Sequence, residues 1–139
     1  MEYPAKIKYS KEDKVFEVDF YDLKGCCTFG ETMEDALKYA KEALTGWLAV
    51  SFDKNKSIPK PSKKSGKDVY YISPDLNVAF AIKLREERSR KKLSQKQIAD
   101  KLGITHQAYQ KFENPNKANV TIKTIMKLEK VLEKKFINI

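Results

Sequence analysis

The side chains best suited to recognition chemistry lie in one short polar segment, residues 106–113. Helical spacing places Tyr109 and Phe112 on one face of that segment. The opposite face then carries His106, Gln107, Gln110 and Lys111. Amide and amino groups of this reach can hydrogen-bond the edges of base pairs in the major groove of DNA. The segment is therefore predicted to be a recognition helix.

A second helix and a tight turn must hold that segment in place. Ser94 is a favourable N-cap for a helix over residues 95–102. Gly103 can adopt the left-handed backbone that ends a helix, and Thr105 can cap the next one. The apolar face of the first helix consists of Ile98, Ala99 and Leu102. This order predicts a helix-turn-helix, whose second helix enters the major groove.

Helical hairpins of this kind also occur without DNA, and the charge distribution favours the DNA-binding interpretation. Residues 78–139 contain 15 Lys and Arg against 6 Asp and Glu, a surplus that equals the net charge of +9 of the whole chain. Residues 1–52 contain 7 basic and 10 acidic side chains, and residues 53–77 contain 6 and 3. Because phosphate neutralisation supplies most non-specific DNA affinity, the location of the excess charge is informative.

Composition excludes several other classes of protein. The 139 residues are 34% charged and 41% hydrophobic, with no apolar run near the ~20 residues that span a bilayer. The first ten residues lack the apolar core of a secretory signal, so a cytoplasmic protein is expected. Cys26 and Cys27 are adjacent and His106 is the lone histidine, so we expect structural thiols, no metal site and no cofactor.

Two breaks in the pattern predict two domains. The stretch 53–67 is rich in Lys, Ser and Pro with little to bury, which predicts an irregular excursion. A turn at residues 73–75 precedes a helix expected to start near residues 76–77. We therefore predict one domain over residues 1–73, with the irregular stretch inside it, and a second over residues 74–139.

The first domain is expected to be α+β. Alternating apolar and polar residues predict strands over 3–9, 15–20 and 25–29, and a fourth over 69–72. Thr32 caps an amphipathic helix with acidic residues in its first turn. The stripe expected to be buried on this helix is Ala36, Leu37, Ala40, Ala43, Leu44, Trp47 and Leu48. These elements give a β-β-β-α-β layer, followed by an all-α helix-turn-helix domain.

Three segments carry a family resemblance. They are YPAKIKY at 3–9, VFEVDFYDLKGCCTFGETMEDALKYAKEALTGWL at 15–48 and IPKPS at 58–62. The residues that match the pattern around the third strand are Phe20, Asp22, Leu23, Gly25, Cys26, Thr28, Gly30, Thr32, Glu34 and Ala36. Tyr21 and Lys24 stand in place of two prolines, Glu31 in place of Asp and Asp35 in place of Glu. Together, these three segments resemble the HicB antitoxin family.

This resemblance has consequences for fold and partners. It implies a partial RNase H-like domain that neutralises a HicA-like, mRNA-cleaving toxin by direct binding, and repression of the shared operon through double-stranded operator DNA. The acidic balance of residues 1–52 suits a basic RNA-binding partner. No residue pattern indicates which side chains contact the toxin.

Residues 78–132 resemble the Cro-like helix-turn-helix family. The resemblance implies that His106, Gln107 and Lys111 contact bases, although His106 could instead cap or solvate the start of the helix. Gln107 can form a bidentate pair with adenine, and Lys111 can reach guanine. This resemblance also implies a homodimer on a two-fold operator.

Further positions have supporting assignments. The Cro-like resemblance implies that Arg88 pairs with Glu113, the alternative being a DNA contact for Arg88. Phosphate contacts are predicted for Ser94, Gln95, Thr105, Asn114, Asn116 and Lys117. A last helix capped by Thr121 is expected to bury Ile122, Ile125, Met126 and Leu128, and an apolar tail of Phe136, Ile137 and Ile139 is expected to pack across a partner.

Two functions from other classes compete with the antitoxin hypothesis. A stand-alone transcriptional regulator would use its first domain to sense a ligand or to dimerise. A nuclease would need several carboxylates around metal ions. Glu17, Asp19 and Asp22 lie on or just after one strand, but no acidic residues on the fourth predicted strand complete such a cage, so no catalytic residue is assigned.

Overall fold

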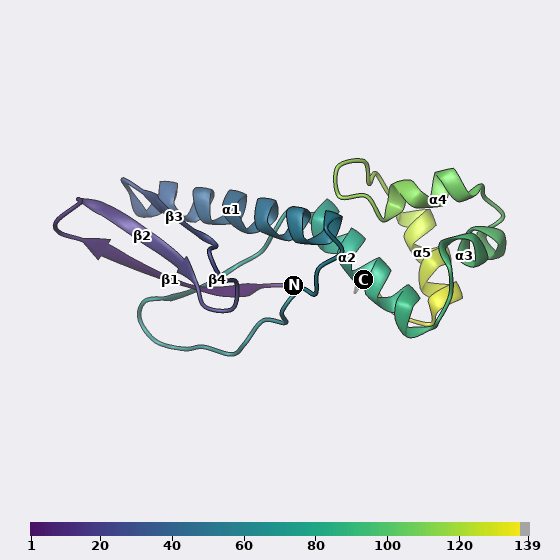
Figure 1. Cartoon of the computed structure of the whole chain (residues 1–139), viewed down its shortest axis with the longest axis horizontal. Coiled ribbons are helices and arrows are strands. Elements are labelled where there is room, and N and C mark those ends of the chain that lie inside the picture. Colours follow the sequence, from purple (N-terminus) through teal and green to yellow (C-terminus); the bar gives the residue numbers. More distant parts are fainter. Residues whose placement is uncertain (137–139) are drawn as a thin grey trace. The chain divides into compact units, whose positions relative to one another are not determined.

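The computed structural model describes residues 1–136 and divides the chain into two compact units, Met1–Asp75 and a second that begins at Leu76 (Figure 1). The first unit contains β1 Tyr3–Ser10, β2 Val15–Phe20, β3 Cys27–Gly30, α1 Met33–Asp53 and β4 Val69–Ile72. The second contains α2 Leu76–Arg90, α3 Gln95–Leu102, α4 His106–Phe112 and α5 Ile122–Leu132. The β-β-β-α-β order predicted from the sequence is confirmed, as is the α+β class.

The first unit is a four-stranded antiparallel sheet with α1 across one face (Figure 1). The strand order is β3-β2-β1-β4, with Ala5 opposite Phe20 and Ile7 opposite Val18. These four side chains are buried, whereas the intervening Lys6 is exposed, as period-two alternation requires. One apolar face of the sheet therefore meets the apolar stripe of α1.

The start of α1 fixes the end of β3. Thr32 caps the helix by accepting a hydrogen bond from the backbone N–H of Asp35 at 3.0 Å. A Cβ on Gly30 would lie 2.4 Å from the backbone nitrogen of Ala36, so only glycine allows this close approach. Gly30 is consequently the last residue of β3, and the expectation of a strand over 25–29 is wrong in its bounds.

The buried stripe of α1 differs from the predicted one at its edge. Leu37 is 36% exposed, so its predicted burial is wrong, and Ala43 and Trp47 are only half-buried. The buried residues are Ala36, Ala40, Leu44, Leu48, Ser51 and Phe52. The sheet covers a narrower sector of the helix than the full run of apolar residues.

The irregular stretch between α1 and β4 is held to the sheet by polar contacts. Tyr3 Oη donates to the carbonyl of Pro59 at 2.7 Å. The backbone N–H of Ser62 donates to Asp22 Oδ2 at 2.9 Å. Tyr71 Oη both accepts from the backbone N–H of Lys64 at 2.8 Å and donates to its carbonyl at 2.7 Å. The stretch thus lacks regular structure but has defined anchors.

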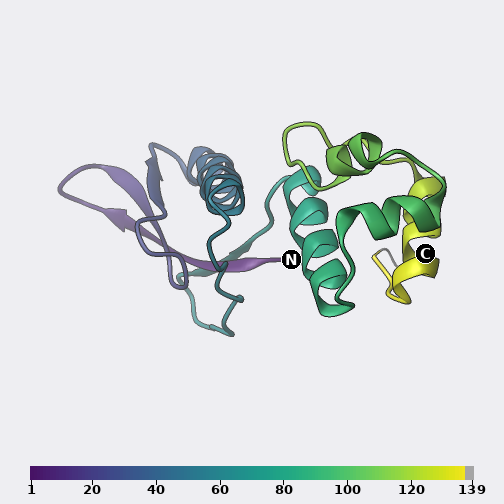
Figure 2. The ribbon, with the colours of Figure 1, turned by 45° about the vertical axis from the view of Figure 1, so that its right-hand side comes forward.

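The second unit is a cluster of four helices (Figure 2). Its core is built from Leu84, Ile98, Ala99, Tyr109, Leu128 and Leu132. The predicted burial of Ile122 and Met126 is wrong, because they are 63% and 56% exposed. Phe136 packs against Phe80, while Ile137 and Ile139 lie outside the described residues.

The thiols of the first unit lie close to a carboxylate, because Cys27 stands opposite Asp19 in the sheet register. Cys26 is buried and Cys27 exposed, and burial raises the pKa of the Cys26 thiol to about 11. Glu17 and Asp19 lie opposite Lys8 and Lys6 in the sheet register. Within residues 1–136, no three His, Cys, Asp or Glu side chains gather as a metal-binding group.

None of the helices of residues 1–136 combines the length and the apolar character that crossing a membrane would need.

Candidate nucleic-acid interface

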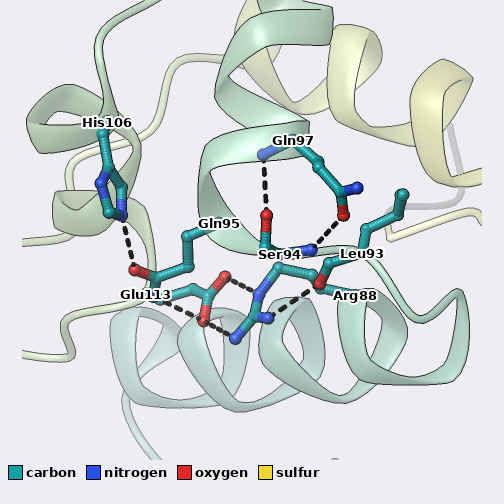
Figure 3. Close-up of polar contacts among 7 residues, drawn as sticks. All are labelled: Arg88, Leu93, Ser94, Gln95, Gln97, His106 and Glu113. Carbon is teal, nitrogen blue, oxygen red and sulfur yellow. Dashed lines mark hydrogen bonds and ion pairs between the residues drawn. The ribbon is translucent and has the colours of Figure 1, made fainter.

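The helix-turn-helix is built from local hydrogen bonds at its two helix starts. Ser94 Oγ accepts from the backbone N–H of Gln97 at 3.0 Å, and Gln97 Oε1 accepts from the backbone N–H of Ser94 at 2.8 Å (Figure 3). This is a reciprocal capping box. Gly103 ends α3 in the left-handed conformation, with φ of 71°. Thr105 then caps α4 by accepting from the backbone N–H of Ala108 at 3.1 Å.

Helix α4 presents a polar surface to solvent. Tyr109 is fully buried and Phe112 is half-buried, so together they fix the inward face of the helix. The predicted outward residues His106, Gln107, Gln110 and Lys111 are all exposed. The side chains that would have to reach base edges are therefore accessible, and those that would obstruct docking are in the core.

A buried ion pair joins the end of α4 to α2. Arg88 Nε lies 2.7 Å from Glu113 Oε2, and Arg88 Nη2 lies 3.0 Å from Glu113 Oε1 (Figure 3). Arg88 Nη1 also donates to the carbonyl of Leu93 at 3.0 Å. The structure thus places the two predicted partners in a bidentate pair, which also holds the turn before α3.

The Glu113 carboxylate changes the protonation properties of its neighbours. Its hydrogen bonds to Arg88 raise the pKa of the guanidinium. Burial, and secondly the negative charge of Glu113, raise the pKa of the Tyr109 phenol, which therefore stays neutral. The interior behind the recognition helix holds one compensated pair of charges and a neutral phenol.

Gln95 connects this ion pair to the exposed surface. Its Nε2 donates to Glu113 Oε1 at 3.3 Å, and its Oε1 lies 3.2 Å from His106 Nε2 (Figure 3). Because the amide nitrogen of Gln95 is committed to Glu113, the oxygen must accept, so His106 Nε2 carries the proton. Gln95 was predicted as a phosphate contact, but the structure engages both ends of its amide within the protein.

The remaining predicted phosphate contacts lie around the two helix starts and in the loop after α4. Ser94 and Thr105 use their oxygens as cap acceptors, and their hydroxyl protons remain available as donors. Asn114 Oδ1 accepts from the backbone N–H of Asn116 at 2.9 Å, which shapes the loop. Asn116 and Lys117 are exposed there. Ser94, Thr105, Asn116 and Lys117 are therefore accessible to a phosphate.

Comparison with known proteins identifies the family. Residues 2–84 match the model of the "HicB_like antitoxin of bacterial toxin-antitoxin system", and residues 84–137 match a helix-turn-helix model. Antitoxin HicB of Escherichia coli K12 is 30% identical over 103 residues, covering 74% of this chain and 73% of that protein. The chain belongs to the HicB-like antitoxin family.

Two further HicB proteins are similar to the chain. Antitoxin HicB 1 of Photorhabdus laumondii is 32% identical over 107 residues, which cover 77% of this chain and 66% of that protein. The crystal structure of the N-terminal domain of Burkholderia pseudomallei antitoxin HicB aligns with 55% of this chain and 100% of its own, at 23% identity and a TM-score of 0.47. The two matched regions show that this HicB-like antitoxin combines the family domain with a helix-turn-helix domain.

The sequence contained signals that our interpretation left unused. The spacing of Ser94 and Gln97 is that of a capping box, which fixes the start of α3 more firmly than the N-cap alone. The bridging role of Gln95 has no such local signal, since it depends on the packing of α3 against α4. The glycine within α1, Gly46, is a second signal, because a glycine inside a helix costs stability.

Replacing Gln107 or Lys111 with Ala is expected to lower affinity for the operator more than it lowers affinity for random DNA. Each bidentate base contact contributes about 1–3 kcal/mol of discrimination, or about 5- to 150-fold in affinity. Titration of both DNAs at one fixed salt concentration measures the ratio. Lys117→Ala is the matched control, expected to weaken both DNAs alike and to reduce the salt slope by about 1. Equal losses on both DNAs for Gln107→Ala would contradict base reading.

Proposed function

We propose that this HicB-like antitoxin neutralises a HicA-like mRNA-cleaving toxin by direct binding through its first unit, and represses the operon that encodes both through its second. The observation that supports this most is the presence, in one chain, of a HicB-like domain and a fully capped helix-turn-helix with an exposed polar face. Binding alone accounts for both activities, so the proposal assigns no catalytic step.

In this proposal the exposed residues of the second unit divide into two roles. His106, Gln107 and Lys111 read base edges, with Gln95 holding the His106 ring in place. Phosphate contacts come from Ser94, Thr105, Asn114, Asn116 and Lys117, with the backbone N–H groups at the two helix starts. The buried ion pair between Arg88 and Glu113 supports α4 on the side opposite these exposed residues.

The test uses the full chain and the small toxin encoded by the neighbouring gene. Co-expression should restore growth that the toxin alone arrests, and affinity-tagged antitoxin should retain the toxin on purification. The same protein should shift a DNA fragment from its own promoter at a salt concentration that abolishes binding to random DNA. A protein that binds the promoter but neither retains the toxin nor restores growth would be a stand-alone regulator instead.

We propose further that the antitoxin is a homodimer joined in part through α5. Ile122 and Met126 lie one turn apart and expose 63% and 56% of their surface, an apolar pair that nothing in the described second unit covers. A second copy would bury the same pair on both subunits of a two-fold operator complex.

Replacing Met126 with Glu is expected to shift the dimer toward monomer and to weaken operator binding. Burying a side chain of this size contributes about 1.5–3 kcal/mol, so the dimer dissociation constant should rise at least about 10-fold. Sedimentation equilibrium measures that constant directly. Lys127→Gln lowers the net charge by the same one unit at the next exposed position and is the control. Unchanged dimerisation of Met126→Glu would place the subunit contact elsewhere.

A further inference from the structure

The first unit contains an open groove of about 660 Å³. One wall is the carboxyl-terminal half of α1, including Gly46, Trp47 and Val50, and the other comprises the turn around Lys24 and the chain leaving α1. Trp47 Nε1 donates to the carbonyl of Lys24 at 3.1 Å, so the indole ties the two walls together. All of these residues belong to a single unit, and the groove is therefore a built feature of the antitoxin domain.

The rim of the groove is positively charged. Lys24, Lys54 and Lys56 line it, all three are exposed, and none forms an ion pair with a residue of the described chain. Asp22 is the acidic residue among those lining the groove, and its carboxylate accepts the backbone N–H of Ser62. Residues 1–75 as a whole hold equal numbers of basic and acidic side chains, so the positive rim is a local property of this site. Its charge is complementary to an anionic partner.

Gly46 indicates that this partner approaches α1 closely. A glycine inside a helix costs about 1 kcal/mol relative to alanine. A Cβ at Gly46 would have no heavy atom within 4 Å, so packing within the chain does not require glycine there. Val50, one turn further on, is 52% exposed and lines the same groove. Helix α1 therefore exposes its backbone at Gly46 and the apolar side chain of Val50 to a partner that enters the groove.

We propose that this groove is where the toxin docks, through a segment that places an apolar side chain over Gly46 and Val50 and carboxylates against Lys24, Lys54 and Lys56. The inference rests on the proposed function and adds the site and the chemistry of the contact. A protein segment fits better than a nucleic acid, because residues 1–75 hold 13 basic and 13 acidic side chains and exert no net attraction on a polyanion. The groove also provides a single tryptophan, whereas single-stranded nucleic acids need a series of stacking platforms.

Two variants separate docking from folding. Gly46→Gln extends a side chain into the groove from a Cβ that meets no heavy atom within 4 Å, and it replaces a helix-breaking residue, so its melting temperature should equal or exceed that of the wild type. The double variant Lys54→Glu, Lys56→Glu reverses the charge of the rim. Both should bind the toxin from the neighbouring gene at least about 10-fold more weakly in calorimetric titration of the full chain. Lys38→Glu, at an exposed position of α1 outside the groove, should stay within about twofold of wild type.

The outcomes distinguish the two levels of the proposal. Promoter binding by each variant shows that the second unit is folded. Wild-type toxin affinity in both groove variants would overturn the docking site while leaving the proposed function intact. A wild-type chain that does not bind the toxin would overturn both. Loss of binding to a single-stranded RNA oligonucleotide in the groove variants, with toxin affinity unchanged, would assign the groove to nucleic acid and overturn the inference.

Discussion

Replacing Arg88 with Met is expected to lower the free energy of unfolding of the second unit by about 3–5 kcal/mol. The Glu113 side chain is only 2% exposed, and Arg88 neutralises it through two hydrogen bonds of 2.7 and 3.0 Å. Without the guanidinium, the structure would hold an uncompensated carboxylate in its interior and an unpaired carbonyl at Leu93. Removing one partner of a buried ion pair lowers the free energy of unfolding by more than the intact pair contributes to it, because the remaining charge stays buried and unpaired.

Urea unfolding with two probes measures this effect. The single tryptophan, Trp47, reports on the first unit, whereas far-ultraviolet circular dichroism also follows the helices of the second. In the Arg88→Met variant, the midpoint urea concentration of the tryptophan signal should stay unchanged. The midpoint of the circular dichroism transition of the second unit should move to a lower urea concentration. Changing Glu113 to Met as well should recover part of the lost stability, because no charge then remains buried. If the free energy of unfolding of the Arg88→Met variant fell by less than about 1 kcal/mol, the ion pair would contribute no more than a surface salt bridge does.

The same variant should also lose affinity for the operator. Glu113 is the C-cap residue of α4 and accepts hydrogen bonds from both Arg88 and Gln95. Gln95 in turn contacts the His106 ring at the start of α4. The ion pair therefore constrains both ends of the recognition helix, and its loss should relax the orientation of every base-contacting side chain.

Local chemistry made the second unit predictable from its sequence. Ser94, Gly103 and Thr105 set the ends of α3 and the start of α4 through bonds to residues three positions away or through their own backbone conformation. Such interactions depend on a few adjacent residues and need no knowledge of the fold. In the first unit, the alternation of apolar and polar residues likewise predicted the strands β1 and β2.

Errors arose where burial depends on what covers a helix. Leu37, Ile122 and Met126 share a face with apolar neighbours, and helical phase alone placed them inside. The sheet covers only part of α1, and the described second unit covers only part of α5, so these three side chains remain exposed. Periodicity reveals which residues share a face, but not how wide the covering surface is.

Side-chain networks and grooves were beyond reach for a related reason. Gln95 looked like a free polar residue at a helix start, and only the packing of α3 against α4 brings it to Glu113 and His106. The groove beside α1 joins residues from positions 22 to 59, which no spacing rule relates. Gly46, a helix-breaking residue in a strongly helical segment, is the signal near the groove that our interpretation left unused.

A chain that ends at Asp75 is expected to retain toxin binding and to lose operator binding completely. The last residues of the first unit are secured within it, since Asp75 N–H donates to Thr45 Oγ1 at 3.1 Å and its carboxylate lies 3.6 Å from Lys41 Nζ. The HicB-like match extends to residue 84, but Leu84 packs in the core of the second unit, so α2 belongs with the helix-turn-helix.

The chain that ends at Asp75 is expected to keep no non-specific affinity for DNA either, because of its charge. Residues 1–75 have no net charge, whereas residues 78–139 carry the whole surplus of the chain, so the truncated protein has little to offer phosphates. Toxin titration and promoter shifts on the truncated and full-length proteins measure the two activities, and the thermal transition of the truncated protein shows that its sheet is intact. Toxin binding that disappears from a folded truncated protein would mean that the second unit also contributes to neutralisation. Retained promoter binding would mean that DNA is held by the sheet, and the assignment of α4 as the reading helix would then fall.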